Sequence, residues 1–401
     1  MKNILFIIMA LFCTGLNLAQ MNNQQIQQKI SKVENGLVEF KFGPPDNSQN
    51  QNTYSLSERM AFYKVPGVSI AVIDNNKIAW TKAYGVLNVD TGTPTTTQSY
   101  FEAASTTKML TAAIVLHFVN KGLIDLDTDV NEYLKSWKVE ENEFTKEKKV
   151  TLRLLLTHQS GLSSTNFPYE INRTPALIQV LKAETPAQNK PAIVEYVPGS
   201  KWQYSNIGYD VIQLLLEDIS GKPLQQIFKE IIFKPLQMNF STMNYPLEKT
   251  LQKSEALPHD KEGKVCEPSM HPSAIAHGGL MTTPNDLALF TIELMRAYSG
   301  QSNKILSKKM VLEMFHPELD LDPAIFGVPL KEGLGVFLQN TEQDFAFGHP
   351  GDNYPGSTCW QMGVPSLGKG VVIMTNSANG FPLAMEIFAA IKKEYNWPVG
   401  L

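Results

Sequence analysis

A serine and a lysine three residues apart stand at the start of an almost uncharged segment. Ser105 and Lys108 bound the sequence STTK, and apolar residues then recur at helical spacing as far as Val119. In a helix, residues i and i+3 lie one turn apart on the same face, with Cβ atoms about 5–6 Å apart. We therefore predict that the Lys108 amine activates the Ser105 hydroxyl as a nucleophile that forms an acyl-enzyme.

The start of this predicted helix favours the chemistry in two ways. Unpaired backbone amides and the positive end of the helix dipole lie beside Ser105, where they stabilise an alkoxide or an oxyanion. An apolar helix also keeps water from Lys108, whose amine is a base at neutral pH only if desolvation lowers its pKa from about 10.4. The alternative is that Ser105 merely caps the helix while Lys108 extends into solvent.

A second group of polar residues, Tyr204-Ser205-Asn206, lies in a loop just before another predicted helix. Beside a cationic Lys108 the Tyr204 phenol would be stabilised as a phenolate, which takes the Ser105 proton and returns it to a leaving group. Asn206 would hold the substrate through its amide, or cap the helix that begins at Ile207, and the two roles can coexist.

The third group is His349-Pro350-Gly351-Asp352, at what the sequence indicates is the end of a strand. A glycine at position 351 lets the backbone approach a substrate closely. The backbone amide of Asp352 would then complete an oxyanion hole with that of Ser105. A simple turn is the ordinary explanation of such a segment on its own.

In this order, the three groups resemble the signature of the serine β-lactamase and penicillin-binding-protein superfamily, in its class C β-lactamase, esterase and D-aminopeptidase-like branch. Two further blocks are similar to family blocks: LLLTHQSGL over residues 154–162 and HGGLMTTPNDL over residues 277–287. The resemblance covers roughly Val65 to Asn379. We expect the histidines in these blocks, His158 and His277, to be hydrogen-bonded structural residues.

The resemblance implies that Ser105 is acylated and that Lys108 and Tyr204 share proton transfer. It also implies that Asn206 and the His349-Pro350-Gly351 strand line the substrate channel. One departure concerns the third group, where most β-lactamases and D,D-peptidases carry Lys-Thr-Gly or Lys-Ser-Gly.

His349 is mostly neutral at pH 7 and Pro350 has neither a hydroxyl nor an N–H, so the family's carboxylate anchor is weakened. The Asp352 carboxylate would repel anions as well. We therefore predict a serine hydrolase of small esters, amides or D-amino-acid peptides. The alternatives are a β-lactamase or D,D-carboxypeptidase, a penicillin-binding receptor that turns over slowly, and an inert member of the family.

Around these groups the sequence predicts strands at both ends of the chain and helices between them. The expected helices are 26–37, 106–119, 206–219, 224–232 and 382–395, and the expected strands are 68–73, 77–84, 333–338, 357–362 and 370–375. The turn residues Asp74-Asn75-Asn76 indicate that the first two strands form a hairpin. This pattern indicates an α/β (α+β) fold in which an antiparallel sheet is flanked by helices and interrupted by a mostly helical domain. Residues 20–115 and 291–401 would form the α/β domain, 116–290 would form the insertion, and the resemblance implies a β-lactamase/transpeptidase-like fold.

The signal sequence, the net charge and the cysteine and histidine content indicate where the protein acts and what it binds. Residues 1–19 have the charged start and short apolar run of a signal peptide, which predicts a periplasmic or secreted protein without stable membrane insertion after its removal. The net charge of −4 argues against nucleic acid, so we expect a small-molecule or short-peptide substrate. The histidines and cysteines do not have the spacings typical of metal sites, so we expect neither a metal nor another cofactor. Cys266 and Cys359 either form a disulfide or remain as thiols.

Overall fold

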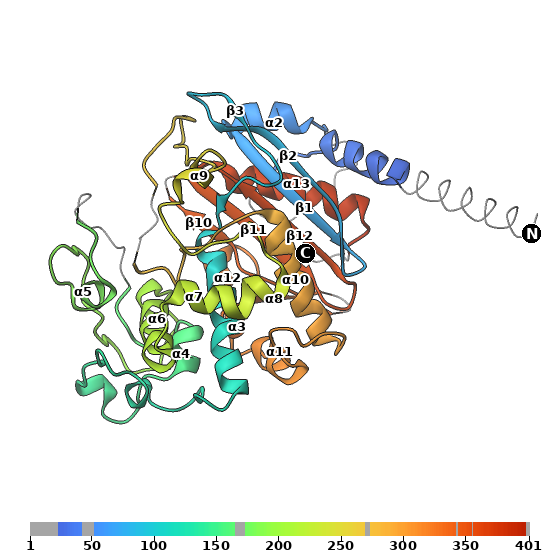
Figure 1. The fold of residues 1–401 in the computed structure, drawn as a ribbon. Coiled ribbons are helices and arrows are strands. Elements are labelled where there is room, and N and C mark those ends of the chain that lie inside the picture. Colours follow the sequence, from blue (N-terminus) through green and yellow to red (C-terminus); the bar gives the residue numbers. More distant parts are fainter. Residues whose placement is uncertain are drawn as a thin grey trace, which may run out of the picture.

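An antiparallel sheet built from both ends of the chain forms the centre of the computed structural model (Figure 1). The structure describes residues 23–41, 52–164, 173–268, 273–341, 344–354 and 356–397, so the predicted signal peptide lies outside the described residues. The sheet order is β3 (Thr93–Pro94), β2 (Lys77–Asn88), β1 (Gly67–Asp74), β12 (Lys369–Thr375), β11 (Ser357–Val364), β9 (Phe345–Gly348), β8 (Phe337–Asn340), β7 (Lys331–Glu332) and β6 (Leu319–Asp320). Because β1 pairs with β12, the prediction that both ends of the chain share one sheet is confirmed.

Three short strands complete the list. β10 (Gly351–Asn353) pairs with β11 beyond β9, and β4 (Phe101–Glu102) pairs with β5 (Met281–Thr282) in a separate two-stranded sheet. The β1–β2 hairpin forms as predicted. Its two-residue turn, Asn75 and Asn76, has positive φ at both positions, a conformation that asparagine tolerates and that matches the twist of the flanking strands.

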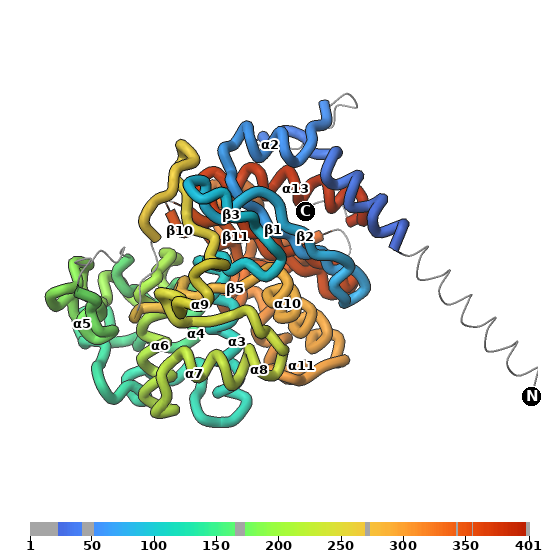
Figure 2. Tube along the Cα trace, turned by 45° about the horizontal axis from the view of Figure 1, so that its top comes forward, coloured from blue at the N-terminus to red at the C-terminus, as the bar shows by residue number. Residues whose placement is uncertain are grey.

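Helices cover both faces of the sheet (Figure 2). A helix over residues 23–34, α2 (Leu56–Tyr63) and α13 (Gly380–Glu394) cover one face, and α10 (Pro284–Tyr298) and α3 (Thr107–Asn120) lie on the other. Successive residues of the central strands therefore enter different cores, with Ile70 and Val72 in one and Ala71 and Ile73 in the other. This explains why β1 is apolar along its whole length.

The remaining helices lie mostly to the left of or below the sheet in Figure 1, although α9 lies higher beside the strands. They are α4 (Leu152–Leu156), α5 (Leu177–Lys182), α6 (Asn206–Ser220), α7 (Leu224–Phe228), α8 (Lys234–Leu236), α9 (Lys249–Gln252), α11 (Lys308–Met314) and α12 (Pro323–Phe326). Short helical turns lie at η1 (Ala104–Thr106), η2 (Val130–Glu132), η3 (Glu143–Thr145) and the π-helical η4 (Lys229–Phe233). Within the described residues no helix has both the length and the apolar character needed to cross a membrane.

Three expectations need correction. The helix predicted over 224–232 forms, but it changes from α-helical in α7 to π-helical in η4 and then continues into α8. The strand predicted over 333–338 begins only at Phe337, because Gly335 has φ of 71° and turns the chain between β7 and β8. Cys266 and Cys359 are both free thiols, so the disulfide alternative is wrong.

Candidate active site

Ser105 lies in η1, the turn that leads directly into α3. Ala104 before it has φ of 48°, a left-handed conformation that is uncommon for a residue with a side chain. The Thr107 hydroxyl donates to the Ala104 carbonyl at 2.6 Å, and the Thr106 hydroxyl donates to the His349 carbonyl at 2.8 Å. These bonds fix the turn against the third polar group and leave the Ser105 side chain partly exposed.

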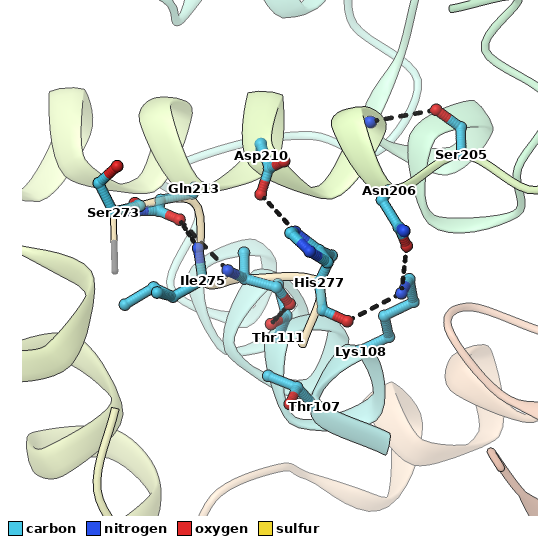
Figure 3. Close-up of polar contacts among 12 residues, drawn as sticks. Thr107, Lys108, Thr111, Ser205, Asn206, Asp210, Gln213, Ser273, Ile275 and His277 are labelled. Atoms are coloured by element: carbon cyan, nitrogen blue, oxygen red, sulfur yellow. Dashed lines mark hydrogen bonds and ion pairs between the residues drawn. The ribbon is translucent and has the colours of Figure 1, made fainter. Parts of the chain in front are cut away.

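Lys108 is fully buried and its amine contacts Ser105. Its Nζ lies 3.0 Å from Ser105 Oγ. The same atom lies 2.8 Å from Asn206 Oδ1 and 2.8 Å from the His277 carbonyl oxygen (Figure 3). Burial lowers the pKa of Lys108 to about 7, against the opposing effect of nearby carboxylates. A neutral amine can donate to Asn206 and His277 while it accepts the Ser105 proton. The alternative of a solvent-exposed Lys108 is therefore wrong.

Tyr204 completes this group from the loop before α6. Its phenol is hydrogen-bonded to the Ser105 hydroxyl, and the Lys108 Nζ lies 4.8 Å from the centre of its ring. Removal of water from the phenol raises the pKa of Tyr204, so the expected phenolate is wrong and the group is a neutral phenol at pH 7. The imidazole of His158 packs 4.2 Å from the Tyr204 ring and accepts from the Ser205 amide at 3.1 Å, a structural role as predicted.

Asn206 is the first residue of α6 and does not cap it. Ser205 has the extended backbone of a cap, and its hydroxyl accepts from the Gly208 amide at 3.3 Å. The Asn206 side chain is therefore free to accept from Lys108. The sequence left open that Asn206 caps the helix, and this is wrong. That the Asn206 amide holds the substrate stays a prediction.

Asp210 and Gln213 lie on the same face of α6 as Asn206, and both bind the segment that carries His277 (Figure 3). Asp210 Oδ1 contacts the His277 ring at 2.9 Å, and Gln213 Oε1 accepts from the Ile275 amide at 2.9 Å. The spacing of Asn206, Asp210 and Gln213 is i, i+4 and i+7, so polar residues at these positions of an apolar helix were a usable signal for this contact. Sequence reasoning missed Asp210 and Gln213.

Gly351 and His349 place the third group against the nucleophile turn. A Cβ on Gly351 would lie 2.1 Å from the Ala103 carbonyl oxygen and 2.9 Å from Thr106 Oγ1. Gly351 therefore allows the backbone to pack closely on the nucleophile turn, and its predicted close approach to a substrate stays a prediction. His349 is buried, its Nδ1 donates to the Pro350 carbonyl at 2.7 Å, and burial lowers its pKa to about 3. It is neutral, as expected.

Asp352 follows on β10, where it pairs with Thr358 of β11 and its side chain is exposed. Its carboxylate therefore lies at the surface near the nucleophile turn. The role of its backbone amide in an oxyanion hole remains a prediction. Within the described ranges, no three His, Cys, Asp or Glu side chains are arranged to hold a metal ion.

We expect Gly351→Ala to reduce both stability and activity. The new methyl group has to displace the Ala103 carbonyl, which costs about 1–3 kcal/mol of unfolding free energy. Displacing the nucleophile turn by about 1 Å should lower kcat/KM by roughly 10²-fold. Gly278→Ala is the matched control, because its Cβ would meet Ala104 only at an ordinary 3.7 Å. If Gly351→Ala and Gly278→Ala had equal melting temperatures and equal kcat/KM, the role of Gly351 in positioning the nucleophile turn would be contradicted.

Glu332 is a buried acid that sequence reasoning missed. Its side chain is fully buried, Oε2 accepts from the Trp202 indole at 2.8 Å, and Oε1 has no hydrogen-bond partner. Burial raises its pKa well above the ordinary value, and in its ionised form Glu332 raises the pKa of both Lys108 and Tyr204. The sequence Lys331-Glu332-Gly333 is typical of an exposed turn, so it carries no signal for this burial.

Glu332→Gln should shift the acid limb of the pH profile of kcat/KM to lower pH. When Glu332 is ionised, its carboxylate stabilises the Lys108 ammonium and raises the pKa of Lys108, so replacing it by a neutral amide lowers that pKa. Glutamine can still accept from Trp202, which limits the change in packing. Glu293→Gln removes another buried carboxyl that bonds Ser302 and serves as the control. An acid limb that stays in place would show that Glu332 does not act on Lys108.

Comparisons with known proteins agree with this geometry. The Beta-lactamase family model matches residues 55–394. The chain is 23% identical over 404 residues to N-acetylmuramyl-L-alanine amidase of Bacillus subtilis (strain 168), covering 92% of this chain and 88% of the relative. It is 25% identical over 247 residues to Protein flp of Staphylococcus aureus (strain MW2), covering 60% of this chain and 48%, about half, of that relative.

Among solved structures, the octameric penicillin-binding protein homologue from Pyrococcus abyssi is 26% identical, with a TM-score of 0.71 over 85% of this chain and 76% of that chain. Its likeness confirms the α/β fold with an antiparallel sheet flanked by helices. The family match spans every polar group described above. The chain therefore belongs to the Beta-lactamase family.

Proposed function

We propose that this protein is a serine hydrolase that acts through an acyl-enzyme on Ser105 and cleaves small esters, amides or D-amino-acid peptides. The observation that carries the proposal is the 3.0 Å contact between Ser105 Oγ and the amine of a fully buried Lys108. The proposal includes export to the periplasm or the medium and a small-molecule or short-peptide substrate. Only the sequence of residues 1–19 and the net charge support those two parts.

In the acylation step, the neutral amine of Lys108 takes the Ser105 proton while Oγ forms a bond to the substrate carbonyl carbon. The backbone amides of Ser105 and Asp352 would hold the resulting oxyanion. The intermediate then expels the alcohol or amine, which takes the proton from the Lys108 ammonium, directly or by exchange through the Tyr204 hydroxyl. Ser105 is left as an ester of the acyl group.

In the deacylation step, water attacks the Ser105 ester. Lys108, neutral again, takes a proton from that water as its oxygen bonds to the carbonyl carbon. Collapse of the second intermediate releases the acid and returns the proton to Ser105 Oγ. The neutral Tyr204 phenol can support both steps as a hydrogen-bond donor, which is a different role from the phenolate base that the sequence suggested.

The third group favours esters and amides over substrates anchored by a carboxylate. His349 is neutral, since burial lowers its pKa to about 3, and Asp352 places a carboxylate at the surface beside it. An amidase also stands among the relatives. A β-lactamase or D,D-carboxypeptidase is the second candidate, because the Ser105, Lys108 and Tyr204 arrangement would serve that chemistry as well.

A covalent probe combined with a substrate screen tests the proposal. A fluorophosphonate should label Ser105, as shown by mass spectrometry of the modified peptide. Purified protein should also turn over at least one member of a panel of p-nitrophenyl esters, D-aminoacyl amides and cephalosporins. Labelling without any turnover would replace the proposal by a slowly reacting penicillin-binding receptor. Failure of the probe to label Ser105 would reject the proposal.

A further inference from the structure

Five rings form a closed circuit beside Ser105. Their centres are 6.2 Å apart for Tyr204 and Trp202, 6.2 Å for Trp202 and Phe326, 5.0 Å for Phe326 and Phe337, 4.7 Å for Phe337 and His349, and 6.1 Å for His349 and Tyr204. The circuit begins and ends at Tyr204, whose phenol is bonded to the nucleophile. The short helix α12, which carries Phe326, is thereby connected to the site.

The outer part of this circuit exposes apolar surface to solvent. Phe326 is 37% exposed, and its neighbours Ile325 and Val328 are 47% and 42% exposed. Trp202 is half-buried beside them. Single exposed apolar residues are ordinary, but three in a four-residue stretch that packs on the residues next to a nucleophile indicate a binding surface.

The charges near this surface disfavour an anionic ligand. His349 within the circuit is neutral. The charged residues that flank α12 are Asp320, Asp322 and Lys331, and Lys331 is paired with Asp320 at 3.1 Å. Two carboxylates and one ammonium leave this flank with a net charge of −1, and the exposed Lys201 beside Trp202 balances it, so the surface has no net positive charge to hold a substrate carboxylate.

We infer that Phe326, with Ile325, Val328 and Trp202, binds an apolar, uncharged acyl group of the substrate that Ser105 attacks. The inference rests on the proposed function and names its substrate class: esters or amides of medium-length aliphatic or aromatic acids. The aromatic side chains offer the acyl chain a surface that removes it from water, and this contact strengthens with each buried methylene.

A series of p-nitrophenyl esters tests the inference. The wild-type protein should hydrolyse the octanoate at least about tenfold faster than the acetate in kcat/KM, and the hemisuccinate, which carries a carboxylate, more slowly than the butyrate. Phe326→Ala should reduce the octanoate-to-acetate ratio at least about fivefold, because octanoate loses more contact than acetate does. Phe326→Leu, which keeps an apolar side chain, should restore most of the ratio.

Phe62→Ala is the matched control, because Phe62 is 63% exposed on α2 and takes no part in the ring circuit. The rate of Ser105 labelling by ethyl and octyl fluorophosphonates gives the same comparison if turnover is slow. A ratio that Phe326→Ala leaves unchanged, with Ser105 still labelled, would overturn the inference and leave the proposed function standing. Absence of labelling in the wild type would instead reject the proposed function.

Discussion

Replacing Ser105 by alanine is expected to abolish fluorophosphonate labelling and to lower kcat by roughly 10⁴- to 10⁶-fold for whichever substrate the screen identifies. The loss should be this large because neither neighbouring hydroxyl can substitute. Thr106 donates to the His349 carbonyl and Thr107 to the Ala104 carbonyl, so both are committed to holding the turn. The measurement is steady-state turnover together with intact-protein mass after exposure to the probe.

Ser299→Ala is the matched control for this experiment, since Ser299 is an exposed serine at the end of α10. Both variants should give the circular dichroism spectrum of the wild type, because Ser105 is partly exposed and supplies no core packing. Residual turnover above a few per cent in Ser105→Ala, or labelling at another residue, would mean that the nucleophile has been misassigned.

The central pair was predictable from sequence because it depends on local geometry alone. One helical turn brings residue 108 beside residue 105, whatever the rest of the chain does, and the structure places the two atoms 3.0 Å apart. The Asn75-Asn76 turn was predictable for the same reason. The contact between Lys108 and Asn206, which are 98 positions apart, was not predicted. The family resemblance placed both residues in one site, and no spacing rule connects them.

The sequence does not predict how deeply a titratable side chain is buried, and burial decides its protonation state. Whether Tyr204 is a phenol or a phenolate depends on how much water tertiary packing removes from its hydroxyl, and the expectation failed there. Glu332 was missed because a lysine and a glycine on either side of it indicate an exposed turn, whereas pairing of β7 with β8 buries it completely. Local pattern predicts contacts within an element better than it predicts burial.

The pH dependence of the reaction should follow Lys108. Only the neutral amine can take the Ser105 proton, and burial lowers the pKa of Lys108 to about 7, so kcat/KM should rise with pH through about 7 and then level off. Lys108→Arg should lose roughly 10²- to 10⁴-fold in kcat at every pH, because a guanidinium stays charged and cannot act as the base. A wild-type profile that is flat between pH 5 and 9 would contradict this assignment.

The same burial also predicts how stability depends on pH, because burying Lys108 destabilises the folded state at a pH where the unfolded chain carries the ammonium. The pKa of Lys108 falls from 10.5 to about 7 on folding, so between these values the unfolded chain binds more protons than the folded one. The free energy of unfolding of the wild type should therefore rise with pH across that window relative to Lys108→Met, and the difference should be constant below pH 7.

Lys108→Met should accordingly be inactive. Its free energy of unfolding at pH 7 should exceed that of the wild type by on the order of a few kcal/mol. Loss of the Lys108 hydrogen bonds to the Asn206 and His277 oxygens reduces this gain. Urea unfolding at pH 7, 8.5 and 10 measures the change, with the exposed Lys309→Met as the control for loss of one positive charge. A gain that does not shrink toward pH 10 would mean that Lys108 is not held neutral by burial. The amine that makes Ser105 reactive would then be an ordinary ammonium, and the proton transfer would have to be assigned to another group.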